Sequence, residues 1–209
     1  MDRPSQSSEV GRREEGIGAA EPILRVSQVS KWFGGIRALD QVSFDIARGR
    51  VHAVIGENGA GKSTLMKILA GVHRKDSGQV FFQGRIFDPH DRRAAQQTGI
   101  LHPSADPVAP PIKRWAVLSA KRERALGEHF VGQLDIRLRS VAAKAQIHKL
   151  IRNLAAEGVA VLMISSELPE ILTISDRIYV MHEGRITGHL LTRSASERTI
   201  MALATKTRL

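Results

Sequence analysis

The nine residues from Gly56 to Thr64 constrain this chain more than any other stretch. They read Gly-Glu-Asn-Gly-Ala-Gly-Lys-Ser-Thr and fit the pattern G-x-x-x-x-G-K-[ST]. The segment before them, Val51–Ile55, is short, mostly apolar and β-branched, which predicts a buried strand. The segment after them, Leu65–Ala70, consists of good helix formers and stops at Gly71. A glycine-rich loop between a strand and a helix predicts a phosphate-binding loop, and the alternative is a turn that binds nothing.

The residue types in this phosphate loop (Gly56–Thr64) specify its chemistry. The glycines let successive backbone N–H groups converge on one point, and the helix N-terminus adds partial positive charge there. We expect Lys62 to reach the β- and γ-phosphates of ATP and the Ser63 hydroxyl to hold Mg²⁺. The predicted nucleotide-binding residues are Gly56, Glu57, Asn58, Gly59, Ala60, Gly61, Lys62, Ser63 and Thr64.

Composition narrows the class of protein. A length of 209 residues suggests one domain, or one with a small appendage. The chain has no cysteine, which excludes disulfides and thiolate metal sites. No apolar run approaches the ~20 residues needed to span a bilayer, and residues 1–20 lack the apolar core of a signal peptide. We therefore expect a cytoplasmic protein that touches a membrane only through a partner.

A chain with a formal net charge of +10 could bind nucleic acid, anionic lipid or an acidic partner. The basic residues form only small clusters, and aromatic residues do not alternate with them in a stacking pattern. This favours a solvated basic surface, and we do not expect nucleic acid to be the partner. The eight histidines show no metal-binding spacing.

Hydrophobic periodicity predicts the remaining elements. Residues 1–21 are expected to form a disordered tail, and an antiparallel patch begins at Ile23, with alternation from Leu39 to Ile46 and a turn at Gly34-Gly35. The region 103–114 holds four prolines and is expected to be an irregular linker. Further strands are expected at 79–83, 99–102 and 159–164, helices at 92–97, 119–134 and 141–156, a hairpin around Glu183-Gly184, and a last helix capped by Ser194 and Glu197.

The run from Ile23 to Gly78 resembles the start of an ABC-transporter nucleotide-binding subunit. The amino-acid sequences of the phosphate loop and of Leu69-Ala70-Gly71 are typical of carbohydrate importers (ribose, galactose or autoinducer-like) that carry two cassettes in tandem. The resemblance implies an α/β P-loop NTPase fold of the ABC type, with a shortened parallel sheet, an N-terminal antiparallel patch and a C-terminal hairpin plus helix. It also implies that Phe33 stacks on adenine, and the alternative is that Phe33 is a core or edge residue.

The second half of the chain resembles the second cassette of such proteins. Ser166, in the run Ser165-Ser166-Glu167, stands where an intact first cassette has a histidine that touches the γ-phosphate. The family also carries an LSGGQ-like signature, followed by an apolar strand that ends in Asp-Glu. The resemblance places both segments where Ser140 is joined directly to Val141 in this chain, and neither is present there. No glutamine follows His102 at the place where the family has one. We expect cassette fragments at 22–102 and 115–209, joined after internal deletions.

These absences imply a chain that binds ATP and is deficient in hydrolysis. Glu167 follows an apolar strand and is a candidate for a substitute base, but a strand followed by Ser-Ser-Glu fits the switch region of the family better. Asp135 and Asp176 are expected to be turn or helix-end residues. The implied role is the ATP-binding component of an importer for a monosaccharide or similar solute. Its implied partners are transmembrane permease subunits and a periplasmic solute-binding protein, at the inner face of the cell membrane. The alternatives are a non-catalytic regulatory protein and a remnant of a decayed gene.

The missing Asp-Glu strand has a consequence for the sheet. By resemblance it would lie beside the phosphate-loop strand, buried on both faces. We expect the strand Val159–Ile164 to pair directly with Val51–Ile55 instead. The helix 141–156 would then cover a narrower sheet, which predicts exposed apolar surface and low stability.

Overall fold

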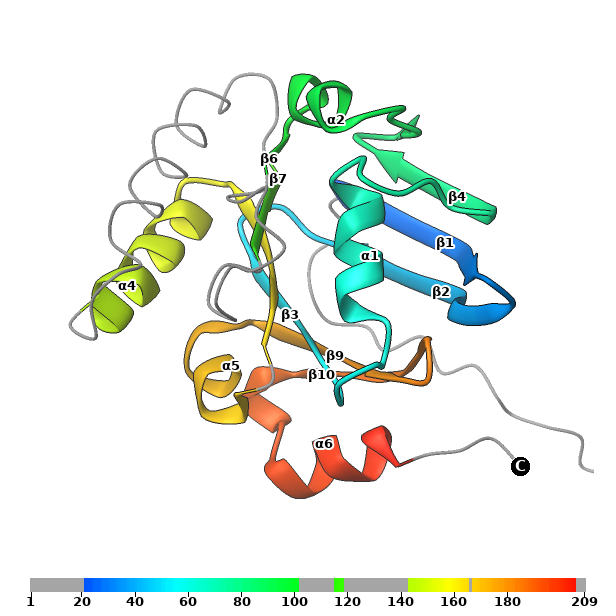
Figure 1. Ribbon diagram of the computed structural model, residues 1–209. Coiled ribbons are helices and arrows are strands. Elements are labelled where there is room, and N and C mark those ends of the chain that lie inside the picture. Colours follow the sequence, from blue (N-terminus) through cyan, green and yellow to red (C-terminus); the bar gives the residue numbers. More distant parts are fainter. Residues whose placement is uncertain (1–20, 102–114, 119–142, 166, 206–209) are drawn as a thin grey trace, which may run out of the picture.

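The computed structural model describes residues 21–101, 115–118, 143–165 and 167–205. The tail at 1–20, the linker at 103–114, the expected helix 119–134 and Ser166 lie outside these residues. The described strands and helices, coloured along the chain in Figure 1, are β1 Leu24–Phe33, β2 Ile36–Ile46, β3 Val51–Ile55, α1 Lys62–Leu69, β4 Ser77–Phe82, β5 Arg85–Ile86, α2 Arg92–Thr98, β6 Ile100–Leu101, β7 Trp115–Leu118, α4 Ala143–Ala156, β8 Ala160–Ile164, α5 Leu168–Ile174, β9 Arg177–His182, β10 Arg185–Leu191 and α6 Glu197–Ala204.

The strands form two sheets. The first is antiparallel, in the order β2-β1-β4-β5, and it confirms the expected N-terminal patch. Along β2 the side chains of Val42, Phe44 and Ile46 are buried and those between them are not, as the alternation predicts. The second sheet has the order β10-β9-β3-β8-β7-β6. Its β9–β10 pair is the expected hairpin around Glu183-Gly184.

The phosphate-loop strand β3 lies inside the second sheet, between β8 and β9, and runs parallel to both. The register pairs Val51 with Val161 and Val54 with Ile164, so no strand separates β3 from β8. The expected direct pairing is confirmed. All five residues of each strand are buried, which is why neither strand alternates: β8 is wholly apolar, and β3 is apolar except for the buried His52.

The strand β7 is an element that the sequence analysis missed. It pairs antiparallel with β8, placing Leu118 opposite Ala160, and β6 pairs antiparallel with β7 in turn. The sheet is therefore mixed and not wholly parallel. Four residues after a proline-rich segment are too few to show a period, so only the tertiary pairing reveals this strand.

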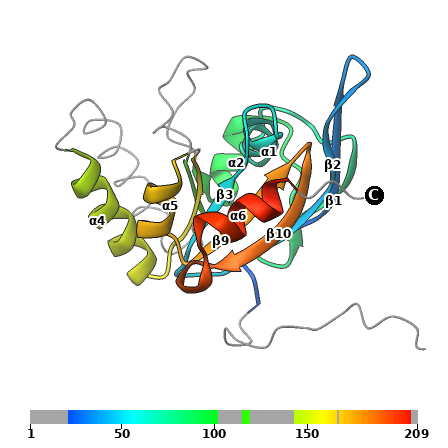
Figure 2. The same cartoon turned by 90° about the horizontal axis from the view of Figure 1, so that it is seen from below.

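Helices cover the second sheet on both faces. In Figure 2, α1 lies between the two sheets, whereas α4 and α5 lie on the far side of the second sheet. Alternate residues of β3 divide accordingly: Val54 packs in the cluster that holds α1 and the first sheet, and Val51, Ala53 and Ile55 pack against α4, α5 and α6.

Two details differ from the sequence-based expectations. Of the apolar positions of α4, Ile147, Ile151 and Leu154 are buried and Leu150 is half-buried, so this helix does not provide the expected exposed apolar surface, while the low stability stays a prediction. The capping box of α6 also lies two residues later than expected. Ser196 is the N-cap and exchanges hydrogen bonds with Thr199, because Ser194 belongs to a preceding 3₁₀ turn, Thr192–Ser194.

Candidate nucleotide-binding site

The phosphate loop joins the C-terminal end of β3 to the first residue of α1. Its backbone requires glycine at defined positions. Gly59 and Gly61 have φ angles of +87° and +98°, in the left-handed region, and Gly61 is the N-cap of α1. The helix therefore begins with its unpaired N–H groups directed toward the loop, which is the arrangement that binds anions.

Close packing beneath the loop explains Gly56 and gives a second reason for Gly61. A Cβ atom at Gly56 would lie 2.1 Å from the Met181 carbonyl oxygen, and one at Gly61 would lie 2.5 Å from the Ala38 carbonyl oxygen. Both clashes are with backbone, which cannot swing aside. The loop thus rests on β9 and β2, and its shape is set by parts of the chain far from it in sequence.

Lys62 is the charged centre of the loop. The side chain is only 5% exposed, and its ammonium donates to the carbonyl oxygens of Gly56, at 2.6 Å, and Glu57, at 2.7 Å. A buried ammonium held within a ring of backbone groups is placed for a polyanion that can replace these carbonyl contacts. The next residue, Ser63, is exposed at the first turn of α1, so its hydroxyl is accessible from solvent.

The β9–β10 turn supports the loop from below, a feature that the sequence analysis missed. The Gly184 N–H donates to the Ala60 carbonyl at 3.1 Å, and the Gly184 carbonyl accepts from the Asp40 N–H at 2.8 Å. The Asp40 carboxylate, 7% exposed, accepts from Arg185 Nε at 2.5 Å and lies 3.0 Å from Arg37 Nη1. Burial would raise the pKa of Asp40, but its two arginine partners outweigh burial and lower it.

Phe33 lies at the end of β1 and is 41% exposed. Its ring meets His73 edge-on, with ring centroids 5.2 Å apart, and lies 5.3 Å from Lys31 Nζ. His73 follows the C-terminal end of α1, whereas the phosphate loop precedes its N-terminal end. An accessible aromatic face is present, and the contacts of Phe33 do not join it to the loop directly.

Glu167 lies at the same edge of the sheet as the phosphate loop, because it follows β8 and β8 runs parallel to β3. It is an exposed residue at the N-cap of α5, and its N–H donates to Ser165 Oγ at 3.0 Å. Ser165 in turn donates to Glu170, at 2.9 Å. Glu170 therefore anchors this turn.

The described residues form neither a metal-binding cluster nor a helix that could span a membrane. Among residues 21–101, 115–118, 143–165 and 167–205, no three histidine or acidic side chains gather so that they could hold a metal ion. In the same part of the chain, every helix is too short or too polar to cross a lipid bilayer.

Asp176, as expected, is a turn residue: it precedes β9, and its carboxylate accepts from the Val51 N–H at 2.8 Å.

Comparison with protein families shows to which family this chain belongs. A family model described as ABC transporter matches residues 39–171, which contain the phosphate loop and both parallel strands β3 and β8. The chain belongs to the ABC transporter family. The fold agrees: 89% of this cassette superposes on 96% of the ADP conformation of MJ1267, an ATP-binding cassette of an ABC transporter, with a TM-score of 0.65 and 21% sequence identity.

Individual relatives are sugar-import proteins. The cassette is 34% identical to the ribose import ATP-binding protein RbsA 2 of Burkholderia cenocepacia, over 79% of this chain and 43% of that protein. It is 30% identical to the putative ribose/galactose/methyl galactoside import ATP-binding protein 2 of the same species, over 88% of this chain and 46% of that protein. The chain therefore spans less than half the length of these relatives.

Proposed function

We propose that this ABC cassette binds Mg-ATP through the phosphate loop. The observation that carries the proposal is the loop geometry: a helix N-terminus, two glycines that admit no Cβ, and a buried ammonium meet at one point. Converging N–H groups and Lys62 would hold the phosphates, and the exposed Ser63 hydroxyl would ligate Mg²⁺. The remaining loop residues from Gly56 to Thr64 shape the backbone around the ligand. Phe33 would stack on the adenine, with its half-exposed face as support.

The similarity to ribose and galactose import proteins supports a role in importing a monosaccharide or a similar small polar solute. In that role the chain would work with transmembrane permease subunits and a periplasmic solute-binding protein. It would then lie in the cytoplasm at the inner face of the membrane.

We also propose that the cassette is shortened internally, with units at 22–102 and 115–209 joined by the linker 103–114 and preceded by the tail 1–21. The alignment to the ribose/galactose relative extends over 236 positions, which is longer than this whole chain of 209 residues. Such an alignment contains residues of the relative that have no counterpart here. This agrees with the sequence, in which the signature and the Asp-Glu strand are missing between Ser140 and Val141.

Hydrolysis is proposed to be deficient as a result. Phosphoryl transfer depends on a positioned water and on charge neutralisation, and the residues that the family resemblance assigns to these tasks are missing from the sequence. Ser166 at the histidine position would not replace them, and Glu167 remains the weaker candidate base. A non-catalytic nucleotide-binding or regulatory role is the second candidate, and the same missing residues favour it.

The test is calorimetric titration of the purified chain with Mg-ATP, together with a turnover assay. Lys62→Ala should abolish binding, whereas Lys67→Ala, which changes an exposed lysine on the same helix, should leave it intact. Turnover should stay at the background rate in the wild type. Binding that survives Lys62→Ala would contradict the site, and turnover that disappears in Glu167→Gln would identify Glu167 as the base.

A further inference from the structure

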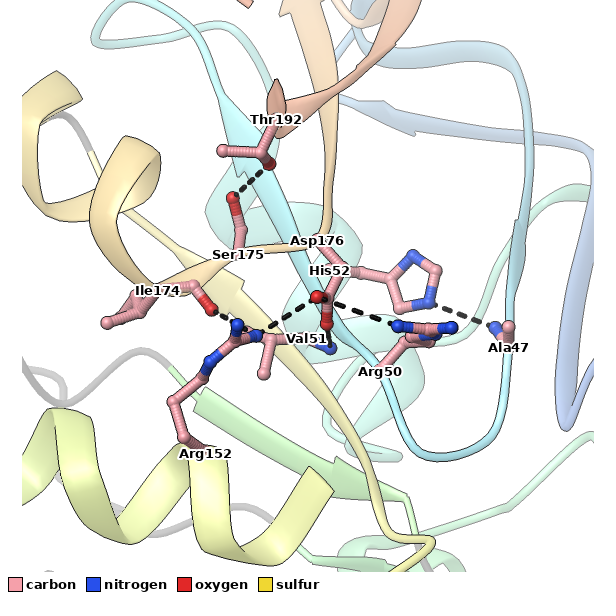
Figure 3. Close-up of polar contacts among 9 residues, drawn as sticks. All are labelled: Ala47, Arg50, Val51, His52, Arg152, Ile174, Ser175, Asp176 and Thr192. Carbon is pink, nitrogen blue, oxygen red and sulfur yellow. Dashed lines mark hydrogen bonds and ion pairs between the residues drawn. The ribbon is translucent and has the colours of Figure 1, made fainter. Parts of the chain in front are cut away.

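A basic pocket lies at the edge of the second sheet opposite the phosphate loop, where β3 and β9 begin (Figure 3). β3 has five residues, so its two ends are about 13 Å apart. The pocket has a volume of about 360 Å³ and lies between α4, α5 and the end of β10. Its charged lining residues are Arg50, Arg152, Arg193 and Asp176, and the hydroxyl residues Thr173, Ser175 and Thr192 also line it.

Among the described residues, Asp176 is the one carboxylate that lines this pocket. It accepts from Arg152 Nη1 at 3.0 Å and lies 3.9 Å from Arg50 Nη1, and Figure 3 shows these two arginines approaching it from opposite sides. Its second oxygen accepts from the Val51 N–H at 2.8 Å. One negative charge thus faces two guanidinium groups while it also holds the start of β3.

Arg193 adds a third positive charge. Within the described part of the chain, no carboxylate forms an ion pair with it. The three hydroxyls that line the pocket are already engaged. Thr173 donates to the Pro169 carbonyl at 2.7 Å, Ser175 donates to the Ile171 carbonyl at 2.6 Å, and Thr192 lies 3.0 Å from Ser175 Oγ. The available donors of the pocket are therefore those of the three arginines.

We propose that the basic pocket binds the dianion of a phosphate group, as a second anion site separate from the phosphate loop. Three arginines and one aspartate leave a charge of +2, which matches a phosphomonoester at neutral pH. Guanidinium groups suit this ligand because each can donate two parallel hydrogen bonds to phosphate oxygens. The phosphodiester of a lipid carries one charge only and would leave the pocket partly uncompensated.

The binding strength follows from exposure. The side chains of Arg50 and Arg152 are 47% and 50% exposed, so water screens their attraction for the anion. We expect weak binding that decreases with added salt. Removal of one arginine should weaken it by about 1.4-fold to fivefold, the range for a solvent-exposed ion pair.

The test uses the Lys62→Ala chain, so that phosphate bound at the phosphate loop does not contribute. Inorganic phosphate and glycerol 3-phosphate are titrated at pH 7.5 and constant ionic strength, and the backbone amide signals of Asp176 and Thr192 are followed by NMR. Arg193→Gln and Arg50→Gln should each weaken binding by the stated factor. Arg198→Gln is the matched control, because Arg198 is an exposed arginine of α6 that does not line the pocket.

A parallel titration with phosphatidylglycerol vesicles distinguishes the source of the phosphate. The proposal predicts shifts with the two soluble phosphates and weaker or no binding to vesicles. It is overturned if vesicles bind more tightly than glycerol 3-phosphate, if neither soluble phosphate shifts these amides, or if Arg193→Gln and Arg198→Gln behave alike. Because Lys62 is already replaced, each of these outcomes leaves the proposal for ATP untouched.

Discussion

At the scale of single residues, the phosphate loop shows two different reasons for glycine. At Gly56 the obstacle to a side chain is steric, since a Cβ would lie 2.1 Å from a backbone oxygen of Met181. At Gly59 no atom lies within 4 Å of that position, and only the φ angle of +87° favours glycine. The pattern G-x-x-x-x-G-K-[ST] contains the first glycine and not the second.

We predict that Gly56→Ala lowers stability more than Gly59→Ala. The first change displaces backbone of the buried strand β9, whereas the second costs only about 1–2 kcal/mol of local strain. Thermal unfolding of both variants, together with Mg-ATP titration, makes the comparison. Equal melting temperatures would show that the loop does not rest on Met181 as described.

His52 is a buried residue that should make stability depend on pH. It is 2% exposed, and its Nε2 accepts from the Ala47 N–H at 3.0 Å, while Nδ1 has no partner among the described residues. Burial, reinforced by the positive charge of Arg177, lowers the pKa of His52 from 6.5 to about 4. Between pH 6.5 and about 4, His52 therefore stays neutral in the folded protein and is protonated in the unfolded chain.

The predicted result is a loss of stability on acidification. Between pH 6.5 and about 4 the unfolded state binds more protons than the folded state, so the free energy of unfolding falls as pH falls, by on the order of 3 kcal/mol from this group. Urea unfolding across that range measures the slope. His52→Gln, which keeps an acceptor for Ala47, should flatten it, and the exposed His90→Gln should not.

At the scale of elements, the helix α6 tests how well a cap can be located from sequence. The spacing of Ser194 and Glu197 fits a capping box, yet Ser196 and Thr199 form it. Several serines and threonines in one short stretch offer more than one frame. Packing decides between them, because Ile200 and Ala204 are buried against the second sheet.

Ser196→Ala should therefore destabilise α6 by about 1 kcal/mol, the usual cost of losing an N-cap hydroxyl. Ser194→Ala should cost less, because its hydroxyl donates only to the exposed Leu191 carbonyl. Chemical denaturation of the two variants provides the measurement. A larger loss of stability for Ser194→Ala than for Ser196→Ala would indicate that Ser194 is the N-cap, as expected from the sequence.

At the scale of the whole molecule, stability depends on how well the helices cover the second sheet. The helix α4 buries Ile151 completely against β3 and β8, while its neighbour Leu150 is only half-buried. Truncation of a fully buried aliphatic side chain costs about 2–5 kcal/mol, which is a large part of a typical total of about 5–15 kcal/mol.

We therefore expect Ile151→Ala to lower the urea midpoint strongly, and even to unfold the chain if its total stability is low. Leu150→Ala on the same helix should have a clearly smaller effect. A small change in both variants would mean that α4 contributes little to the fold. Saturating Mg-ATP should raise both midpoints, because a ligand that binds only the folded state stabilises it.

The sequence by itself determined the strand, loop and helix of the phosphate site, the antiparallel patch and the C-terminal hairpin, because each rests on a local pattern of glycines or hydrophobic period. It also led to the pairing of β3 with β8, since both are short and largely apolar. Only the tertiary structure decided the rest: the insertion of β7, the turn at Gly184 beneath the loop, and the gathering of Arg50, Arg152 and Arg193 around Asp176. These features depend on contacts between residues far apart in the chain, and such contacts leave no period or motif in the sequence.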